Sequence, residues 1–167
     1  AAFDCMKNPD DYTARANMMW ASSLAHNGLT QCGREFQLVV HQFEHELSGM
    51  YPKIAHGAGL AALWCSWARY VYKANISRWL QYSANVWNLD IDYEHPEKTI
   101  EEAINLQEQY YVSLGMPIGL KALGVEEASL TKLALNCSRN KTRTLTGYKP
   151  LAYDDILAIY QMAYERG

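Results

Sequence analysis

The sequence predicts an all-α fold of about seven helices, in one domain that spans residues 1–167. Apolar residues recur at helical spacing in successive segments. Capping residues, prolines and glycines mark the ends of these segments. No segment shows the alternation that is typical of a β-strand. With 167 residues, 49% hydrophobic and 20% charged, the chain has an ordinary globular composition and enough length to bury a core.

Three helices are expected in the first half of the chain, over residues 11–26, 35–47 and 56–73. For the first of them, Asn8 is the expected cap, Pro9 lies in the first turn, and Gly28 follows the end. Its apolar residues cover more than one face, so this helix should be largely buried. The third helix is apolar nearly all round, and we therefore expect it to lie at the centre of the fold.

Four further helices are expected in the second half, over residues 77–87, 97–114, 125–136 and 153–164. The segments between them are turn-like or irregular. The last connection carries four basic residues: Arg139, Lys141, Arg143 and Lys149. They could contact a phosphate or a protein partner, although such runs are more often solvated loops.

Charge and cysteine content restrict the class of protein. A net charge of −3 gives no reason to expect binding to nucleic acid or to an anionic membrane. The longest uncharged run, between Lys53 and Arg69, is too short to cross a bilayer. The chain has four cysteines: Cys5, Cys32, Cys65 and Cys137. They are far apart and form no CxxC pair, which indicates reduced thiols and a cytoplasmic location.

The functional signal lies in three of the five histidines, His41, His45 and His56, within a 16-residue window. Residues four apart share one face of a helix, so His41 and His45 should point the same way. His56 opens the next helix, where the helix dipole disfavours an imidazolium and so favours the neutral ring that binds metals. The three imidazoles could be structural, or they could converge as metal ligands or as an acid–base group.

A short pattern offers one enzymatic interpretation. The spacing His41-x-x-Glu44-His45 is that of inverted zinc peptidases, in which two histidines bind zinc and the glutamate activates water. Three downstream acids could supply the third ligand: Glu101, Glu102 and Glu108. The pattern is short enough to occur by chance, and it leaves His56 without a role.

Two longer strings enclose the same histidines, HQFEHELSG at residues 41–49 and HGAGLA at residues 56–61. The upstream string NPDDYTARAN at residues 8–17 and the downstream string SLGMP at residues 113–117 accompany them. Together these strings resemble the iron-containing (group III) alcohol dehydrogenases, most closely the butanol-dehydrogenase-like branch. The resemblance covers essentially the whole chain.

This resemblance implies the helical, metal-binding C-terminal domain of a dehydroquinate synthase-like fold. It also implies an N-terminal nucleotide-binding α/β domain, which is absent from this chain; the missing initial Met fits a fragment. The family holds a divalent metal, Fe²⁺ or Zn²⁺, with one Asp and three His. Two of these ligands match His41 and His56, and His45 matches a conserved histidine that faces the active site, so we expect it to be catalytic.

The function implied by the resemblance is NAD(P)-dependent interconversion of small alcohols and aldehydes by hydride transfer. Without the nucleotide domain and the upstream ligands, the isolated chain should be inactive. An exposed cleft wall around Leu60 and Trp64 could then make it a homodimer. Trp20, Trp64 and Trp67 are candidates for an apolar substrate wall, although large aromatic residues are more often core. A helical interaction module without activity is the remaining alternative.

Overall fold

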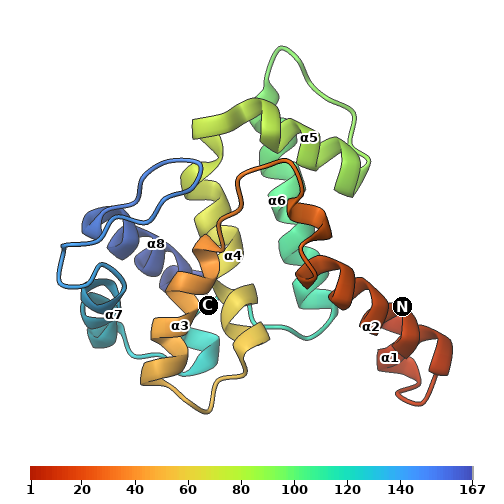
Figure 1. The fold of residues 1–167 in the computed structure, drawn as a ribbon, viewed down its shortest axis with the longest axis horizontal. Helices are drawn as coiled ribbons and strands as arrows, with labels where there is room; N and C mark the ends of the chain where they lie inside the picture. The colour runs from red at the N-terminus through yellow and green to blue at the C-terminus, as the bar shows by residue number, and fades with distance from the viewer. Residues whose placement is uncertain (167) are drawn as a thin grey trace. The chain divides into compact units, whose positions relative to one another are not determined.

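The computed structural model describes residues 1–166, which fall into two compact units, Ala1–Gln37 and a larger one from Leu38 onward. The smaller unit contains α1 (Ala2–Lys7), α2 (Tyr12–His26) and a 3₁₀ turn, Leu29–Gln31. The larger unit contains α3 (Val39–Met50), α4 (His56–Val71), α5 (Ile76–Trp87), α6 (Pro96–Ser113), α7 (Leu130–Cys137) and α8 (Tyr153–Glu165) (Figure 1). Within residues 1–166 the only β feature is an isolated bridge between Leu145 and Leu151. The all-α prediction is confirmed.

The smaller unit differs from expectation in two ways. Asp11, not Asn8, caps α2: its side chain accepts a hydrogen bond from the Ala14 amide at 2.9 Å, whereas Asn8 ends the unexpected helix α1. The expected burial of α2 is also wrong, because Ala14 is its one buried residue, and Met19 and Trp20 are 70% and 66% exposed. Only α1 and the 3₁₀ turn pack on α2 within this unit, and they are too short to cover apolar residues spread around the helix.

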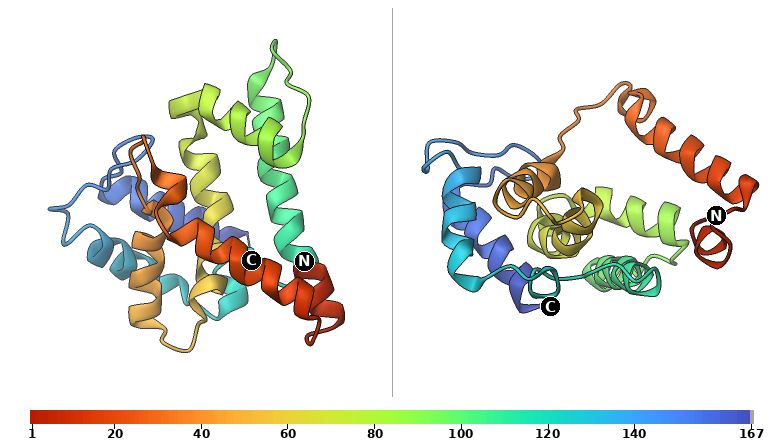
Figure 2. Two further views of the ribbon diagram at one scale, coloured as in Figure 1. Left: turned by 45° about the vertical axis from the view of Figure 1, so that its right-hand side comes forward. Right: turned by 90° about the horizontal axis from the view of Figure 1, so that it is seen from below.

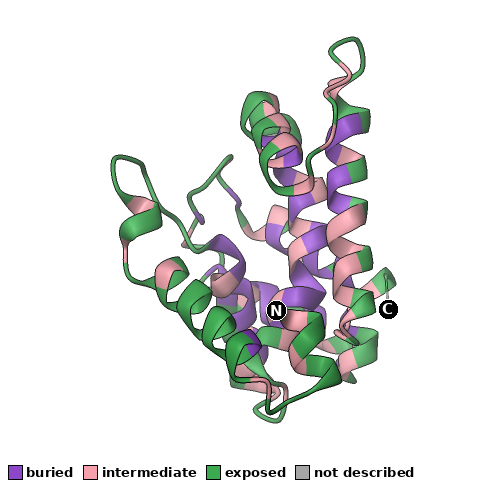
Figure 3. Cartoon of the chain, turned by 90° about the vertical axis from the view of Figure 1, so that its right-hand side faces the viewer, coloured by how far each residue is buried: buried purple, intermediate pink, exposed green. Residues whose placement is uncertain are grey.

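In the larger unit α4 is central, as its apolar pattern predicts. It packs against α3, α6 and α8, and the buried residues gather where these helices meet (Figure 3). Phe43, Leu63, Ile104 and Ile159 are fully buried there. Tyr160 joins them, and its hydroxyl donates a hydrogen bond of 2.8 Å to the Phe43 carbonyl, which ties α8 to α3.

The remaining helix boundaries follow the periodic patterns where these have clear ends. α5 and α6 lie where they were expected and pack against each other (Figure 2). α3 begins at Val39 rather than at Glu35, because the residues that enter the core begin with Val39 and Val40. α7 begins at Leu130, after a 3₁₀ turn at Glu127–Ser129, rather than at residue 125.

The four cysteines are free thiols. Burial raises the pKa of the Cys65 thiol to about 12 and that of Cys137 also to about 12. Both thiols therefore stay protonated at neutral pH and pack as small apolar groups. None of the helices in residues 1–166 combines the length and the apolar content needed to cross a bilayer.

Candidate metal centre

The structure brings the three predicted histidines together. His41 and His45 lie on α3, and His56 is the first residue of α4. The ring centroid of His56 lies 5.2 Å from that of His41 and 5.6 Å from that of His45. The centroids of His41 and His45 are 6.0 Å apart. We call these three residues the histidine cluster. Two imidazoles that bind one ion at nitrogen distances near 2.1 Å have centroids about 5 Å apart, so the spacing suits shared ligation.

The loop between α3 and α4 sets the position of His56 relative to the other two rings. Tyr51 ends α3, and its carbonyl accepts a hydrogen bond of 3.0 Å from the Ile54 amide, which turns the chain. The Tyr51 hydroxyl donates to the Ser129 hydroxyl at 2.7 Å and accepts from the Glu126 amide at 3.2 Å. These contacts anchor the loop to the segment before α7. The loop that leads to His56 is therefore held by the end of α3 and by the segment before α7.

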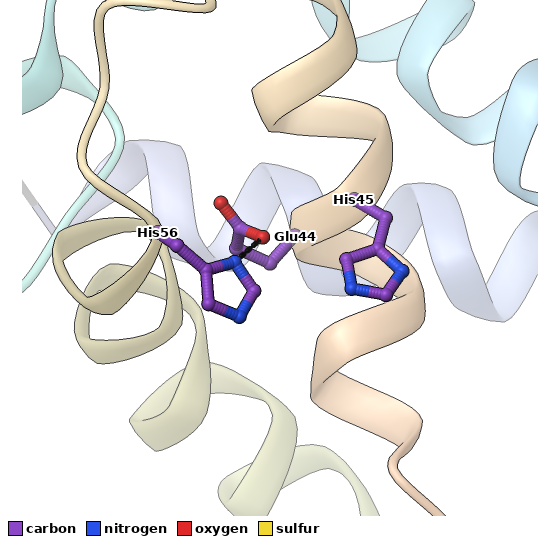
Figure 4. A group of neighbouring side chains, drawn as sticks. All are labelled: Glu44, His45 and His56. Carbon is purple, nitrogen blue, oxygen red and sulfur yellow. Dashed lines mark hydrogen bonds and ion pairs between the residues drawn. The ribbon is translucent and has the colours of Figure 1, made fainter.

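A buried carboxylate lies behind the cluster. Glu44 is fully buried, although glutamate is rarely buried without a partner. One of its oxygens accepts a hydrogen bond of 2.5 Å from the Ser48 hydroxyl, and the other contacts Nδ1 of His56 (Figure 4). Sequence reasoning considered Glu44 only as the water-activating group of a peptidase. It missed the contact with His56, which lies 12 positions further along the chain.

Gly59 makes room for this carboxylate. A Cβ atom at position 59 would lie 2.8 Å from Cγ and 2.9 Å from Oε1 of Glu44, closer than side-chain carbons approach. The glycine therefore lets the start of α4 pack closely on α3. The sequence carried a signal for this approach, because a glycine inside a helix costs stability and usually has a packing reason.

The donor set fits a divalent transition metal. Nitrogen and oxygen ligand atoms of Glu44, His45 and His56 all lie within 4.8 Å of one another, and the His41 ring adjoins them. Imidazole and carboxylate donors suit both Zn²⁺ and Fe²⁺. The His56 side chain is 46% exposed, so a bound ion would be accessible from outside this chain. Because Nδ1 of His56 contacts Glu44, Nε2 is the ring nitrogen whose lone pair remains for a metal.

Two of the three downstream acids, Glu101 and Glu108, lie beside a different partner, Arg69. Arg69 on α4 donates a hydrogen bond of 2.6 Å to Glu108, and its Nε is 3.6 Å from Glu101. In the described part of the chain, the group with metal-ligand spacing contains none of the three acids that were candidates for a third zinc ligand.

The aromatic candidates are divided between the two units. Trp64 and Trp67 are partly buried against the core, with ring centroids 6.0 Å and 5.8 Å from that of Trp79, whereas Trp20 is exposed in the smaller unit. The first two therefore have the packing role that burial statistics favour.

Residues of the basic loop have partners within the larger unit. Lys149 lies 3.0 Å from an oxygen of Asp155, and Arg143 donates to the Gln42 side chain at 2.6 Å. These contacts give the loop a structural role.

Residues 2–164 match the model of the Fe-containing alcohol dehydrogenase family, C-terminal. NADH-dependent butanol dehydrogenase A of Clostridium acetobutylicum is 38% identical over 160 residues, which are 95% of this chain and 41% of that protein. The NADPH-dependent aldehyde reductase YqhD of Escherichia coli is 30% identical over 162 residues, 95% of this chain and 40% of that protein. The crystal structure of NADH-dependent butanol dehydrogenase A from Thermotoga maritima matches with a TM-score of 0.88 and 30% identity, over 96% of this chain and 42% of that one. The chain thus spans about two-fifths of the length of these relatives.

Proposed function

We propose a function from one premise: the chain belongs to the Fe-containing alcohol dehydrogenase family, whose C-terminal model spans residues 2–164. The proposal is that it forms the helical part of an NAD(P)-dependent alcohol dehydrogenase that interconverts alcohols and aldehydes. Both compact units would belong to one metal-binding domain, since the family model covers both. The nucleotide-binding α/β domain and NAD(P)H would belong to the part of such an enzyme that this chain does not span.

One observation carries the proposal: three imidazoles from two helices meet beside a buried carboxylate. In the proposed site, His41 and His56 hold a divalent metal, Fe²⁺ or Zn²⁺, together with an Asp and a His from the rest of the enzyme. When bound, the metal would supply Lewis-acid polarisation of the substrate oxygen. His45 stands beside both ligands, where a ring nitrogen can hold or pass a proton of the alcohol. The relatives' names support the nicotinamide cofactor.

The peptidase alternative needs Glu44 to activate a water molecule. Each oxygen of this carboxylate already has a protein partner, Ser48 or His56, and the side chain is fully buried. A general base must reach the proton that it removes. This arrangement supports a positioning role for Glu44, and we therefore propose the dehydrogenase over the peptidase.

The test uses the full-length enzyme that contains this chain. We expect metal-dependent reduction of NAD(P)⁺ with a short-chain alcohol, and a loss of at least about 100-fold in kcat/KM on His56→Ala, because a ligand matters more than its supporting groups. The control is His95→Ala, in the loop before α6. Unchanged activity in His56→Ala, or peptide cleavage that depends on Glu44, would contradict the proposal.

The isolated chain should behave differently from the full-length enzyme. Residues 1–167 would supply two of the four proposed ligands and no nucleotide site, so we expect weak metal binding and no dehydrogenase activity. In this respect the isolated chain would be the inactive helical module of the alternative hypothesis. Sedimentation of residues 1–167 over a range of concentrations would test the expected homodimer.

A further inference from the structure

The contact between Glu44 and His56 has a role of its own, if the proposed metal site is accepted. We infer that Glu44 is a positioning residue: it fixes the rotation and the tautomer of the His56 ring so that Nε2 is presented to the metal. Gly59 is the residue that allows Glu44 to reach this place. This inference rests on the proposed function, and it gives a role to Glu44 and Gly59, which are not among the proposed metal ligands.

The hydrogen bond between Glu44 and His56 determines which ring nitrogen carries the proton. A carboxylate oxygen can only accept, so the Nδ1 atom that contacts Glu44 must carry the proton. In the neutral ring Nε2 then has the lone pair, and Figure 4 shows this atom pointing away from Glu44. A carboxylate behind a histidine ligand fixes the ring in this way and makes the ligand more basic.

The surroundings of Glu44 suit a positioning residue and not a metal ligand. Its side chain is fully buried, whereas the His56 side chain is 46% exposed. Its Oε1 accepts a hydrogen bond from Ser48 of the next turn of α3, and its Oε2 faces Nδ1. Both oxygens are therefore directed at protein groups, and the exposed side of the site is left to the imidazoles.

α3 and α4 approach each other closely at Gly59. A Cβ atom at position 59 would meet Glu44 at 2.8 Å and Leu47 at 3.2 Å, so a side chain there must push the carboxylate away. Gly57, on the same helix, has no atom within 4 Å of the corresponding Cβ position. Gly59 and Gly57 are therefore a matched pair for mutation, because an added side chain would displace Glu44 only at position 59.

The experiment measures Zn²⁺ affinity of the full-length enzyme by competition with a chelator, and the visible spectrum of the Co²⁺-substituted form. We expect Glu44→Ala to weaken Zn²⁺ binding by about 10- to 100-fold and to alter the Co²⁺ spectrum. Glu44→Gln should recover most of the affinity, because the amide oxygen still accepts the Nδ1 proton. A Glu44→Gln variant as weak as Glu44→Ala would overturn the positioning role, since the negative charge or direct ligation would then be what matters.

A double-mutant cycle tests the role of Gly59. Gly59→Ala should weaken Zn²⁺ binding in the wild-type background and have little further effect in Glu44→Ala, whereas Gly57→Ala should have little effect in either. Additive losses would show that Gly59 acts independently of Glu44 and would overturn the inference. If Glu44→Ala loses its helical circular dichroism, Glu44→Ser, whose side chain is too short to reach His56, takes its place in the cycle, and the same result is expected.

The two proposals fail in different ways. If His56→Ala abolishes metal binding but Glu44→Ala binds Zn²⁺ as the wild type does, the metal site stands and the positioning role is wrong. If His56→Ala keeps its metal, the proposed site itself is wrong.

Discussion

Glu44 is fully buried, yet each of its carboxylate oxygens has a partner, Ser48 or His56. Burying a carboxylate without partners costs free energy of folding, and the two contacts offset this cost. Ser48 sits one helical turn after Glu44 and holds the carboxylate in the rotamer that meets His56. A chain of polar contacts therefore runs from the histidine cluster into the protein, from His56 to Glu44 and on to Ser48.

We predict that Ser48→Ala lowers the free energy of unfolding by about 1–2 kcal/mol, because it removes one hydrogen bond from a buried charged acceptor. Urea denaturation measures this change. Ser77→Ala on α5 is the control: its hydroxyl donates a hydrogen bond of 3.1 Å to Asn75 at an exposed position, so its loss should change the free energy of unfolding by less than about 0.5 kcal/mol. Equal stability of the two variants would mean that the Ser48 contact contributes nothing to the fold.

The candidate site was predictable from the sequence in part. The spacing of four residues between His41 and His45 predicted that they share one face of a helix. The apolar run that begins after His56 predicted that His56 starts a helix, and the structure agrees with both predictions. The contact between Glu44 and His56 was not predictable. It depends on the direction in which the loop around Tyr51 reverses the chain, and that direction comes from hydrogen bonds to Ser129 and Glu126, far along the sequence.

Helix positions were predictable wherever the apolar stripe had clear ends. α4, α5, α6 and α8 lie within a residue or two of their expected bounds. The starts of α3 and α7 were placed too early, because propensity and acidic first-turn residues indicate that a helix can begin but not where packing begins. For both helices the first α-helical residue is one that enters the core, Val39 or Leu130.

Asp155, in the first turn of α8, makes this helix sensitive to acid. Burial alone would raise the pKa of Asp155, but hydrogen bonds from the Tyr70 hydroxyl, Lys149 and the Ala152 amide outweigh it and hold the pKa below its usual value. The distances are 2.7 Å, 3.0 Å and 2.9 Å. A pKa that is lower in the folded state adds stability above the unfolded value, and this stability is lost as the pH falls through the folded value.

We therefore predict that Asp155→Asn destabilises the protein by about 1 kcal/mol at pH 6, and that this difference from the wild type shrinks as the pH falls below about 4. Urea denaturation at pH 6 and at pH 3.5 measures both differences. Asp90→Asn, an exposed acid of the loop before α6, is the control. A stability gap for Asp155→Asn that is the same at both pH values would show that the carboxylate charge does not stabilise α8.

The chain as a whole consists of two compact units, and the smaller one shows the limit of sequence reasoning. The apolar residues of α2 predicted burial, but Met18, Met19 and Trp20 are exposed in this chain. An apolar helix face indicates that a partner is needed, and not which chain or domain supplies it. The larger unit contains its own partners, so its central helix and its core were predictable.

The central claim is that His41 and His56 together hold a divalent metal in the enzyme to which this chain belongs. The most direct test is the metal content of the purified full-length protein, measured by elemental mass spectrometry for the wild type, His41→Ala, His56→Ala and the control His95→Ala. We predict about one ion per chain in the wild type and the control, and nearly none in His41→Ala and His56→Ala, because each removes one of the four proposed ligands. Full metal content in either ligand variant would contradict the claim.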